Sequence, residues 1–201
     1  MTRVLVASRN AKKLAEMRRI LDAKDVAGIE IVGLDDVPPF PEEPETGATF
    51  EENALAKARD AVRATGLPAV ADDSGLAIDA LNGMPGVLSA RWSGGHRDDR
   101  ANVELVLGQL GDVPDERRGA AFVCAVALVR PDGSEVVVRG EWPGRIVREP
   151  RGDNGFGYDP IFVPEGEERT SAELPSAEKD EISHRGRALR ALLPHLRELA
   201  G

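Results

Sequence analysis

Asp72 and Asp73 are adjacent carboxylates in an otherwise apolar, strand-like segment, residues 67–79. Ionised groups at the end of a buried strand are costly to desolvate unless they are paired, hydrogen-bonded or bound to a cation. Fewer ordinary explanations are therefore available for this pair than for acidic residues on the surface. The alternative is a solvated turn, because Asp, Ser and Gly are common turn residues, and the segment alone leaves both open.

A second candidate site is residues 8–13, Ser-Arg-Asn-Ala-Lys-Lys, where a predicted strand over 3–8 leads into a helix with Asn10 as its N-cap. Such a turn directs backbone N–H groups and the positive end of the helix dipole at one spot. Lys13 adds a positive charge in the first turn, where the helix dipole alone disfavours one. We therefore expect an anion such as a phosphate to bind there. The glycines of a Walker loop are missing, and an ordinary helix start is the alternative.

Lysine is scarce, with five among the 26 basic residues, and four of the five lie in unusual segments: Lys12, Lys13, Lys57 and Lys179. Because an ammonium is a compact charge suited to phosphate oxygens, this distribution favours phosphate contacts. Lys57 shares a helix face with Asn53, and its side chain either extends to solvent or reaches into a cleft. Glu45, just before that helix, is a possible third carboxylate for the Asp72 and Asp73 site.

Aromatic residues make up only 4% of the chain, yet two of them lie among glycines in residues 152–160. On a strand, Phe156 and Tyr158 would face the same way and stack on a nucleobase. Ordinary core aromatics at a Gly-rich strand end are the alternative.

Residues 178–187 begin a predicted helix whose first turns carry several hydrogen-bond donors. Lys179, Ser183 and His184 follow at i, i+4 and i+5, with Arg185 beside them. One end of this helix therefore presents several donors to a ligand, or else these residues form a solvated helix face.

The elements that must position these residues alternate between strand and helix and then become richer in strands. A proline- and glutamate-rich loop over 38–47 precedes a helix that a capping box at 49–52 opens and Gly66 ends. Residues 98–110 predict a further helix, and 120–130 with 135–141 predict a hairpin. Pro194 is expected to kink or restart the last helix.

Length and composition predict one soluble domain over 1–201, because 201 residues with 41% hydrophobic content can bury a sizeable core. The longest apolar run, 120–129, is too short to span a membrane. Cys124 is the only cysteine, so no internal disulfide can form and a cytoplasmic location is expected. The net charge of −9 argues against a sequence-independent nucleic-acid binder.

Six motifs resemble, in order and spacing, the inosine/xanthosine triphosphate pyrophosphatases. They are SRNAKK (8–13), FEENALAKA (50–58), ADDSGL (71–76), PGVLSARWSG (85–94), GFGYDPIF (155–162) and SHRG (183–186). The resemblance implies a mixed α/β fold with a long central sheet, flanking helices and two lobes around a cleft. It also implies a homodimer and Mg²⁺-dependent cleavage of ITP, dITP or XTP to monophosphate and pyrophosphate, which cleanses the nucleotide pool.

The resemblance also implies roles for individual residues. Asp73 resembles the general base, Lys57 a second catalytic residue, and the Mg²⁺ ligands would be Glu45, Asp72 and Asp73. The implied substrate-binding residues are Ser8, Arg9, Asn10, Ala11, Lys12, Lys13, Asn53, Ser74, Phe156, Gly157, Tyr158, Asp159, Lys179, Ser183, His184 and Arg185. Lys13 and Lys57 are expected to repel each other until a triphosphate joins them.

Two other classes of function stay open. Asp73-Ser-Gly75 matches the aspartic-protease signature, and one copy per chain would require a dimeric site with two aspartates sharing a proton. That interpretation leaves the lysines unexplained. A non-catalytic nucleotide sensor would bind the same ligand without turnover.

Overall fold

A computed structural model describes residues 1–24, 26–95 and 97–200 of the chain. The strands are β1 (Thr2–Val6), β2 (Ile29–Val32), β3 (Ala69–Ile78), β4 (Met84–Pro85), β5 (Gly119–Val129), β6 (Glu135–Ile146) and β7 (Phe162–Pro164). The α-helices are α1 (Ala11–Ala23), α2 (Phe50–Thr65), α3 (Asp99–Gln109), α4 (Ser176–Ile182) and α5 (His184–Leu199). Within the described ranges the strand order is β2-β1-β3-β5-β6-β7, with β4 paired to β3. The mixed α/β fold class is thereby confirmed.

The chain divides into two compact units, each assembled from separate segments. Unit 1 comprises Met1–Asp73, Cys124–Gly140 and Arg185–Gly201, and unit 2 comprises Ser74–Val123 and Glu141–His184. Strands β3, β5 and β6 contribute residues to both units. The predicted cleft between two lobes, and the prediction of one domain over 1–201, stay predictions.

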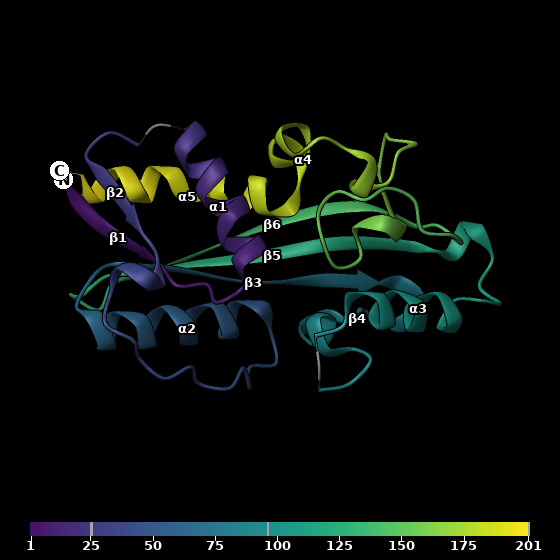
Figure 1. Cartoon of the computed structure of the whole chain (residues 1–201), viewed down its shortest axis with the longest axis horizontal. Coiled ribbons are helices and arrows are strands. Elements are labelled where there is room, and N and C mark those ends of the chain that lie inside the picture. The colour runs from purple at the N-terminus through teal and green to yellow at the C-terminus, as the bar shows by residue number, and fades with distance from the viewer. Residues whose placement is uncertain (25, 96, 201) are drawn as a thin grey trace. The chain divides into compact units, whose positions relative to one another are not determined.

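Unit 1 contains the parallel strands β2 and β1 and parts of β3, β5 and β6, with helices on both faces of its strands. β1 pairs in parallel with β2, from Thr2↔Ile29 onward, and with β3 at Leu5↔Ala69. Figure 1 shows α1 and α5 on one side of these strands and α2 on the other. The core on the first side joins α1, α5 and alternate residues of the strands, which is the pattern expected for one face of a sheet.

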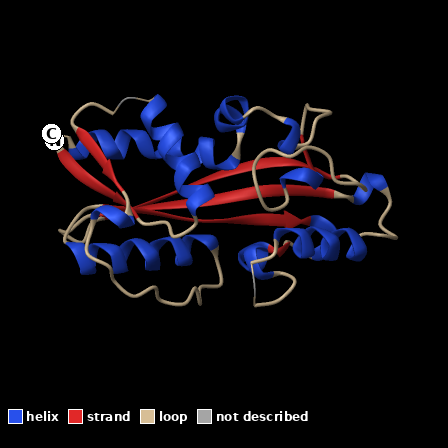
Figure 2. Ribbon diagram, viewed as in Figure 1, coloured by secondary structure: helices blue, strands red, loops and turns tan. Residues whose placement is uncertain are grey.

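Local signals account for both ends of α2. The Oγ1 of Thr49 accepts a hydrogen bond from the Glu52 N–H at 3.1 Å, and Gly66 ends the helix in the left-handed conformation with φ 70°. Glu52 bonds back to the N–H of Ala48 rather than that of Thr49, so the expected capping box is shifted by one residue. The residues before α2, 37–49, form the loop drawn in Figure 2.

Unit 2 is built around antiparallel pairs. β4 pairs with β3 at Ala77↔Pro85, and β7 pairs with β6 at Gly144↔Pro164. Its core combines the apolar face of α3 with large side chains that include Trp142 and Phe162. Figure 2 shows α3 and α4 beside the strands of this unit.

Three expectations about elements are wrong. β3 does not end at the acidic pair but continues through Asp72 and Asp73 to Ile78. Residues 152–160 are a turn rather than a strand, because Gly155 and Gly157 have φ of 73° and 61°. The helix expected at 178–187 is divided at Ser183, whose extended backbone (φ −69°, ψ 163°) separates α4 from α5.

The last helix and the hairpin agree more closely with expectation. α5 runs from His184 to Leu199 with Pro194 inside it and does not restart there. The turn at Gly133, with φ 87°, joins β5 to β6, and β6 continues beyond the expected residue 141 to Ile146.

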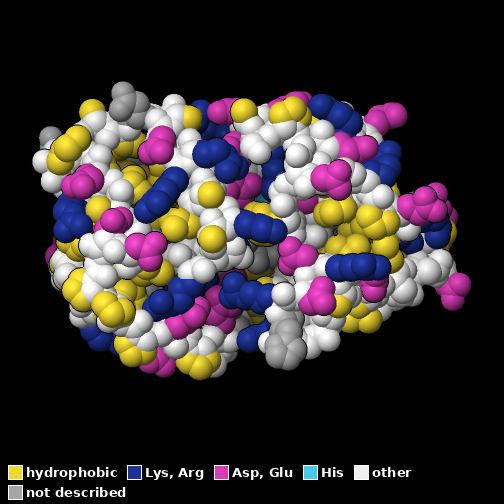
Figure 3. Space-filling view, viewed as in Figure 1, with side chains coloured by type: hydrophobic (Ala, Val, Ile, Leu, Met, Phe, Trp, Pro, Cys, Tyr) yellow, Lys and Arg dark blue, Asp and Glu magenta, His cyan; other side chains and the backbone are white. Residues whose placement is uncertain are grey.

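Basic and acidic side chains are interspersed over the face shown in Figure 3. In unit 1, Arg59 Nε lies 2.6 Å from Glu135 Oε1, and Arg139 Nη1 lies 2.8 Å from Glu51 Oε1. These ion pairs connect α2 to β6. None of the helices within residues 1–24, 26–95 and 97–200 is long and apolar enough to cross a membrane.

Candidate active site

Asp72 is a buried carboxylate held by cations. Only 2% of Asp72 is exposed, so the alternative of a solvated turn is wrong. Its Oδ2 lies 3.2 Å from Arg185 Nη2 and 3.4 Å from Lys13 Nζ, and the Cys124 thiol donates to it at 3.9 Å. Burial alone would raise the pKa of Asp72, but the charges of Lys13, Arg185 and Lys57 hold it well below its usual range. Asp72 is therefore ionised at neutral pH and holds the two cations in place.

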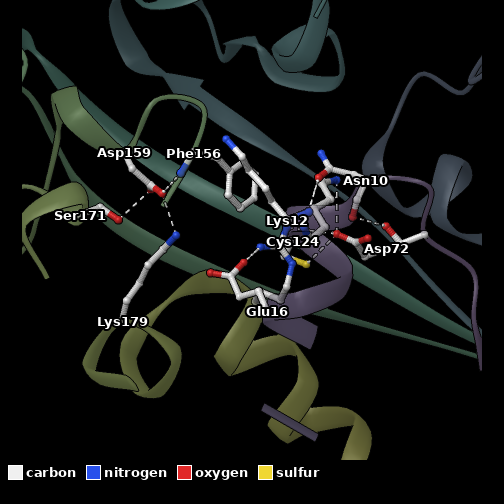
Figure 4. Close-up of polar contacts among 12 residues, drawn as sticks. Asn10, Lys12, Glu16, Asp72, Cys124, Phe156, Asp159, Ser171 and Lys179 are labelled. Carbon is white, nitrogen blue, oxygen red and sulfur yellow. Dashed lines mark hydrogen bonds and ion pairs between the residues drawn. The ribbon is translucent and has the colours of Figure 1, made fainter. Parts of the chain in front are cut away.

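Arg185 joins Asp72 to a second buried carboxylate, that of Glu16. The Arg185 side chain is 1% exposed and donates to both Glu16 and Asp72. Burial would lower the pKa of Arg185, but the charges of Glu16 and Asp72 raise it instead. Figure 4 shows Glu16, Asp72 and Cys124 converging in unit 1. Sequence reasoning missed Glu16, although its position beside Met17 on the apolar face of α1 was a signal.

Asp73 differs from its neighbour because it is close to another carboxylate. Its Oδ2 accepts a hydrogen bond from Asn53 Nδ2 at 2.9 Å, and the residue is 4% exposed. Burial and the charge of Glu45 raise the pKa of Asp73 against the opposing effects of Lys13, Lys57 and Asn53. A carboxylate with a raised pKa is suited to accept a proton during catalysis.

Lys57 pairs with Glu45: the Nζ of Lys57 lies 2.8 Å from the Oε1 of Glu45. Burial would lower the pKa of Lys57, but the charges of Asp72, Glu45 and Asp73 raise it. The expectation that Lys13 and Lys57 repel each other in the unliganded protein is therefore wrong, because each ammonium has a carboxylate partner. A phosphate would have to compete with these partners.

The carboxylates of unit 1 differ in how well they suit a metal ion. Among the described residues, no three His, Cys, Asp or Glu side chains form a group able to hold a metal by themselves. Mg²⁺ in nucleotide enzymes needs only one or two carboxylates, because waters and substrate phosphates complete its shell. Glu45 and Asp73 fit that requirement, since Glu45 is near enough for its charge to raise the pKa of Asp73. Asp72 fits it less well because Lys13 and Arg185 contact its Oδ2.

The turn before α1 is built as its sequence predicts. Asn10 caps the helix, and its Oδ1 accepts from the N–H groups of Lys12 at 3.1 Å and Lys13 at 3.2 Å. Two N–H groups at this helix start are thus already bonded within the protein. Ser8 Oγ donates to the Asn10 carbonyl at 3.4 Å, and Ala11 is exposed.

Arg9 connects this turn to the loop before α2. Its Nη2 donates to the Phe40 carbonyl at 2.7 Å, its guanidinium carbon lies 5.2 Å from the centroid of the Phe40 ring, and its Nε lies 3.5 Å from Glu42 Oε2. Arg9 is therefore engaged with the loop in this structure.

In unit 2, Asp159 organises the turn that carries the aromatics, as Figure 4 shows. The carboxylate of Asp159, a residue 2% exposed, accepts from Lys179 Nζ at 2.8 Å, Ser171 Oγ at 2.8 Å and the Phe156 N–H at 3.0 Å. A Cβ at Gly155 would lie 2.0 Å from Asp159 Oδ2, so the turn requires glycine there. Lys179 Nζ also lies 5.3 Å from the centroid of the Phe156 ring. Sequence reasoning missed Ser171.

The remaining predicted residues of unit 2 differ in exposure. Tyr158 is 4% exposed, and its hydroxyl donates to the Ser89 carbonyl at 2.6 Å, so its ring belongs to the core rather than to a stacking surface. Ser183 is buried. His184 stacks on Phe122 with centroids 4.8 Å apart. Three other predicted residues of unit 2 are partly exposed, namely Ser74, Phe156 and Gly157.

Unit 1 therefore brings together two ammonium groups and three carboxylates, namely Lys13, Lys57, Glu45, Asp72 and Asp73. The cations can hold phosphate oxygens, and a carboxylate with a raised pKa can orient and deprotonate water. This combination is suited to phosphoryl chemistry.

Comparisons with known proteins agree with this chemistry. Residues 4–195 match the model of the Ham1 family. The chain is 74% identical over 200 residues to the dITP/XTP pyrophosphatase of Nocardia farcinica, an alignment that covers 100% of this chain and 97% of that protein. It is 67% identical to a nucleoside-triphosphatase / dITP/XTP pyrophosphatase from Mycobacterium abscessus of known crystal structure, with TM-score 0.79 over 97% of this chain and 100% of the other. A HAM1 protein from Coxiella burnetii is 46% identical, with TM-score 0.87 over 98% and 100%. The chain therefore belongs to the Ham1 family.

Proposed function

We propose that this chain hydrolyses noncanonical purine nucleoside triphosphates, ITP, dITP and XTP, to the monophosphate and pyrophosphate. The observation that carries the proposal is the position of Asp73, a buried carboxylate with a raised pKa in the electrostatic field of Lys13 and Lys57. The printed names of the relatives from Nocardia farcinica and Mycobacterium abscessus support the substrate class. The reaction would remove aberrant purines from the nucleotide pool.

The residues of unit 1 supply most of what the reaction needs. Asp73 accepts a proton from the attacking water, whose oxygen becomes bonded to phosphorus as the anhydride bond between the α- and β-phosphates breaks. Lys13 and Lys57 exchange their carboxylate partners for phosphate oxygens and so hold the triphosphate. Glu45 and Asp73 would hold Mg²⁺, which would supply neutralisation of the phosphate charge.

The purine base is assigned to residues of unit 2. Phe156 is partly exposed, and the donors would come from Lys179 of α4, from Ser183 after it and from His184 at the start of α5. A pocket lined by donors would favour a 6-oxo purine over adenine, because the 6-amino group would leave buried donors unsatisfied. Such mismatches cost about 1–3 kcal/mol per group.

The direct test is pyrophosphate release from ITP, XTP and ATP, with and without Mg²⁺, using the Asp73→Asn variant as the inactive control. The proposal expects Mg²⁺-dependent release from ITP and XTP with kcat/KM well above that for ATP. Binding of ITP without turnover would favour the sensor alternative, and metal-independent peptide cleavage at acid pH would favour the aspartic-protease alternative. Equal kcat/KM for ITP and ATP would refute the proposed base preference.

A homodimer in the cytoplasm is part of the same proposal. Its support is the family resemblance of the six motifs, together with the expectation that a lone buried thiol suits a reducing compartment. Sedimentation velocity at micromolar protein concentration distinguishes a dimer from a monomer.

A further inference from the structure

Asn53 lies in the first turn of α2 and is bonded at both ends of its side chain. It is 2% exposed. Its Nδ2 donates to Asp73 Oδ2 at 2.9 Å, and its Oδ1 accepts from the backbone N–H of Gly47 at 2.8 Å. The resemblance assigns Asn53 to substrate binding, yet both ends of its amide are occupied within the protein.

The Gly47 N–H determines which way the amide of Asn53 points. A side-chain amide has one acceptor end and one donor end, and a backbone N–H can only donate. The oxygen of Asn53 must therefore face Gly47, and the nitrogen must face Asp73. An aspartate at position 53 could still accept from Gly47 but would present a second carboxylate to Asp73.

Gly47 allows this contact because it has no side chain. A Cβ at Gly47 would lie 2.6 Å from Asn53 Oδ1 and 2.8 Å from Glu52 Cβ, so any larger residue would displace the amide or the loop. The φ of Gly47 lies outside the left-handed region that favours glycine, so the restriction is one of space alone.

Helix α2 also contacts Glu45, the second carboxylate of the proposed metal pair. Glu45 precedes Gly47 by two residues and pairs at 2.8 Å with Lys57, which follows Asn53 by one helical turn. The first turns of α2 thus contact the loop that carries Glu45 and the strand that carries Asp73.

We propose that Asn53 is a positioning residue, which fixes Asp73 relative to Glu45, and that the Gly47 N–H sets the direction of its amide. The inference rests on the proposed function and reassigns Asn53 from contact with the nucleotide to support of the carboxylates. Groups that orient metal-binding or catalytic side chains typically contribute 10- to 100-fold in metal affinity or activity.

The experiment compares Asn53→Ala, Asn53→Asp and Gly47→Ala with the unmodified protein. Thr49→Ala is the matched control, because it removes only the Thr49 hydroxyl, whose hydrogen bond in the same turn of α2 comes from the Glu52 N–H rather than from Asn53 or Asp73. Steady-state hydrolysis of ITP at saturating Mg²⁺ gives kcat and KM separately. Mn²⁺ titration of the nucleotide-free protein gives metal affinity, and thermal unfolding identifies variants that fail to fold.

The proposal expects kcat to fall by about 100-fold in Asn53→Asp, with KM within about threefold of the unmodified protein. Gly47→Ala should reduce kcat in the same way, and Asn53→Ala should weaken Mn²⁺ binding by about tenfold. Thr49→Ala should lower the melting temperature and leave kcat and Mn²⁺ affinity unchanged.

Three results would overturn the proposal. A KM raised more than tenfold at constant kcat in the Asn53 variants would place the amide on the nucleotide. A lower melting temperature with normal kcat and normal Mn²⁺ affinity would make Asn53 structural only. If the unmodified protein releases no pyrophosphate from ITP or XTP, the proposed function fails. In that case an unchanged Mn²⁺ affinity in Asn53→Ala also overturns the positioning role.

Discussion

Replacing Arg185 with Met should destabilise the protein strongly, because it leaves two buried carboxylates without their shared cation. Arg185, Glu16 and Asp72 are 1%, 2% and 2% exposed, so water cannot replace the lost guanidinium. Methionine retains much of the aliphatic volume, which limits the contribution of a cavity. Lys13 remains near Asp72 at 3.4 Å and offsets part of the loss there.

The magnitude follows from the burial of these groups. Removing one partner of a buried ion pair costs about 3–5 kcal/mol. For a chain of this size, each kcal/mol lowers the melting temperature by about 2–4 °C, so Arg185→Met should melt about 6–20 °C lower. The difference from the unmodified protein should grow as pH rises from 5 to 7, because the unpaired carboxylates then lose the protons that relieve their repulsion.

Urea unfolding followed by circular dichroism at pH 5 and pH 7 measures these free energies. Arg100→Met is the control, since Arg100 pairs with Glu104 at 89% and 62% side-chain exposure and exposed pairs contribute about 1 kcal/mol or less. Combining Glu16→Gln with Arg185→Met should recover part of the loss. An Arg185→Met variant that unfolds within 1 kcal/mol of the unmodified protein would refute the reasoning.

Three further changes have defined outcomes. Asp73→Asn should lower kcat for ITP by about 10²- to 10⁴-fold, because an amide cannot accept the proton. The melting temperature should not fall, because burial and Glu45 already disfavour the ionised form of Asp73. Full activity of Asp73→Asn would contradict this prediction. Asp72 has a lowered pKa when folded, so its stabilisation is present above its ordinary value of 3.8 and is lost as pH falls below it. Unfolding free energy between pH 5 and 3 should therefore fall less steeply in Asp72→Asn than in the unmodified protein, and equal slopes would count against the pairing. Burial raises the pKa of the Cys124 thiol to about 12, so iodoacetamide at pH 8 should label it only after unfolding, and mass spectrometry of the folded protein tests this.

Signals that act over a few residues were read correctly from the chain. Asn10 bonds to the N–H groups of the next turn because a short amide side chain reaches them wherever the helix lies. Gly66 ends α2 because a residue without Cβ adopts a positive φ at little cost. These interactions need no partner from a distant segment.

Two expectations failed because distant segments decide the outcome, and a third failed without such an explanation. The acidic pair was expected at the end of β3, but Arg185 and Lys13 offset the cost of burying Asp72, so the strand continues. Tyr158 was assigned to base stacking, whereas Ser89, 69 residues away, accepts its hydroxyl and places its ring in the core. The expected helix over 178–187 is interrupted at Ser183, and we have no local sequence signal that explains the break.

The chain alone specified the residue types of the site and the order of its elements, because hydrophobic period, caps and turn residues act locally. It could not specify partners, since Glu16 and Arg185 are 169 residues apart and meet only when α1 and α5 pack on the same face of the sheet. The different ionisation of Asp72 and Asp73 has the same origin. Adjacent residues of a strand point to opposite faces. Asp72 therefore contacts Arg185 and Lys13, while Asp73 contacts Asn53 of α2. Tertiary packing thus gives two neighbouring carboxylates opposite pKa shifts.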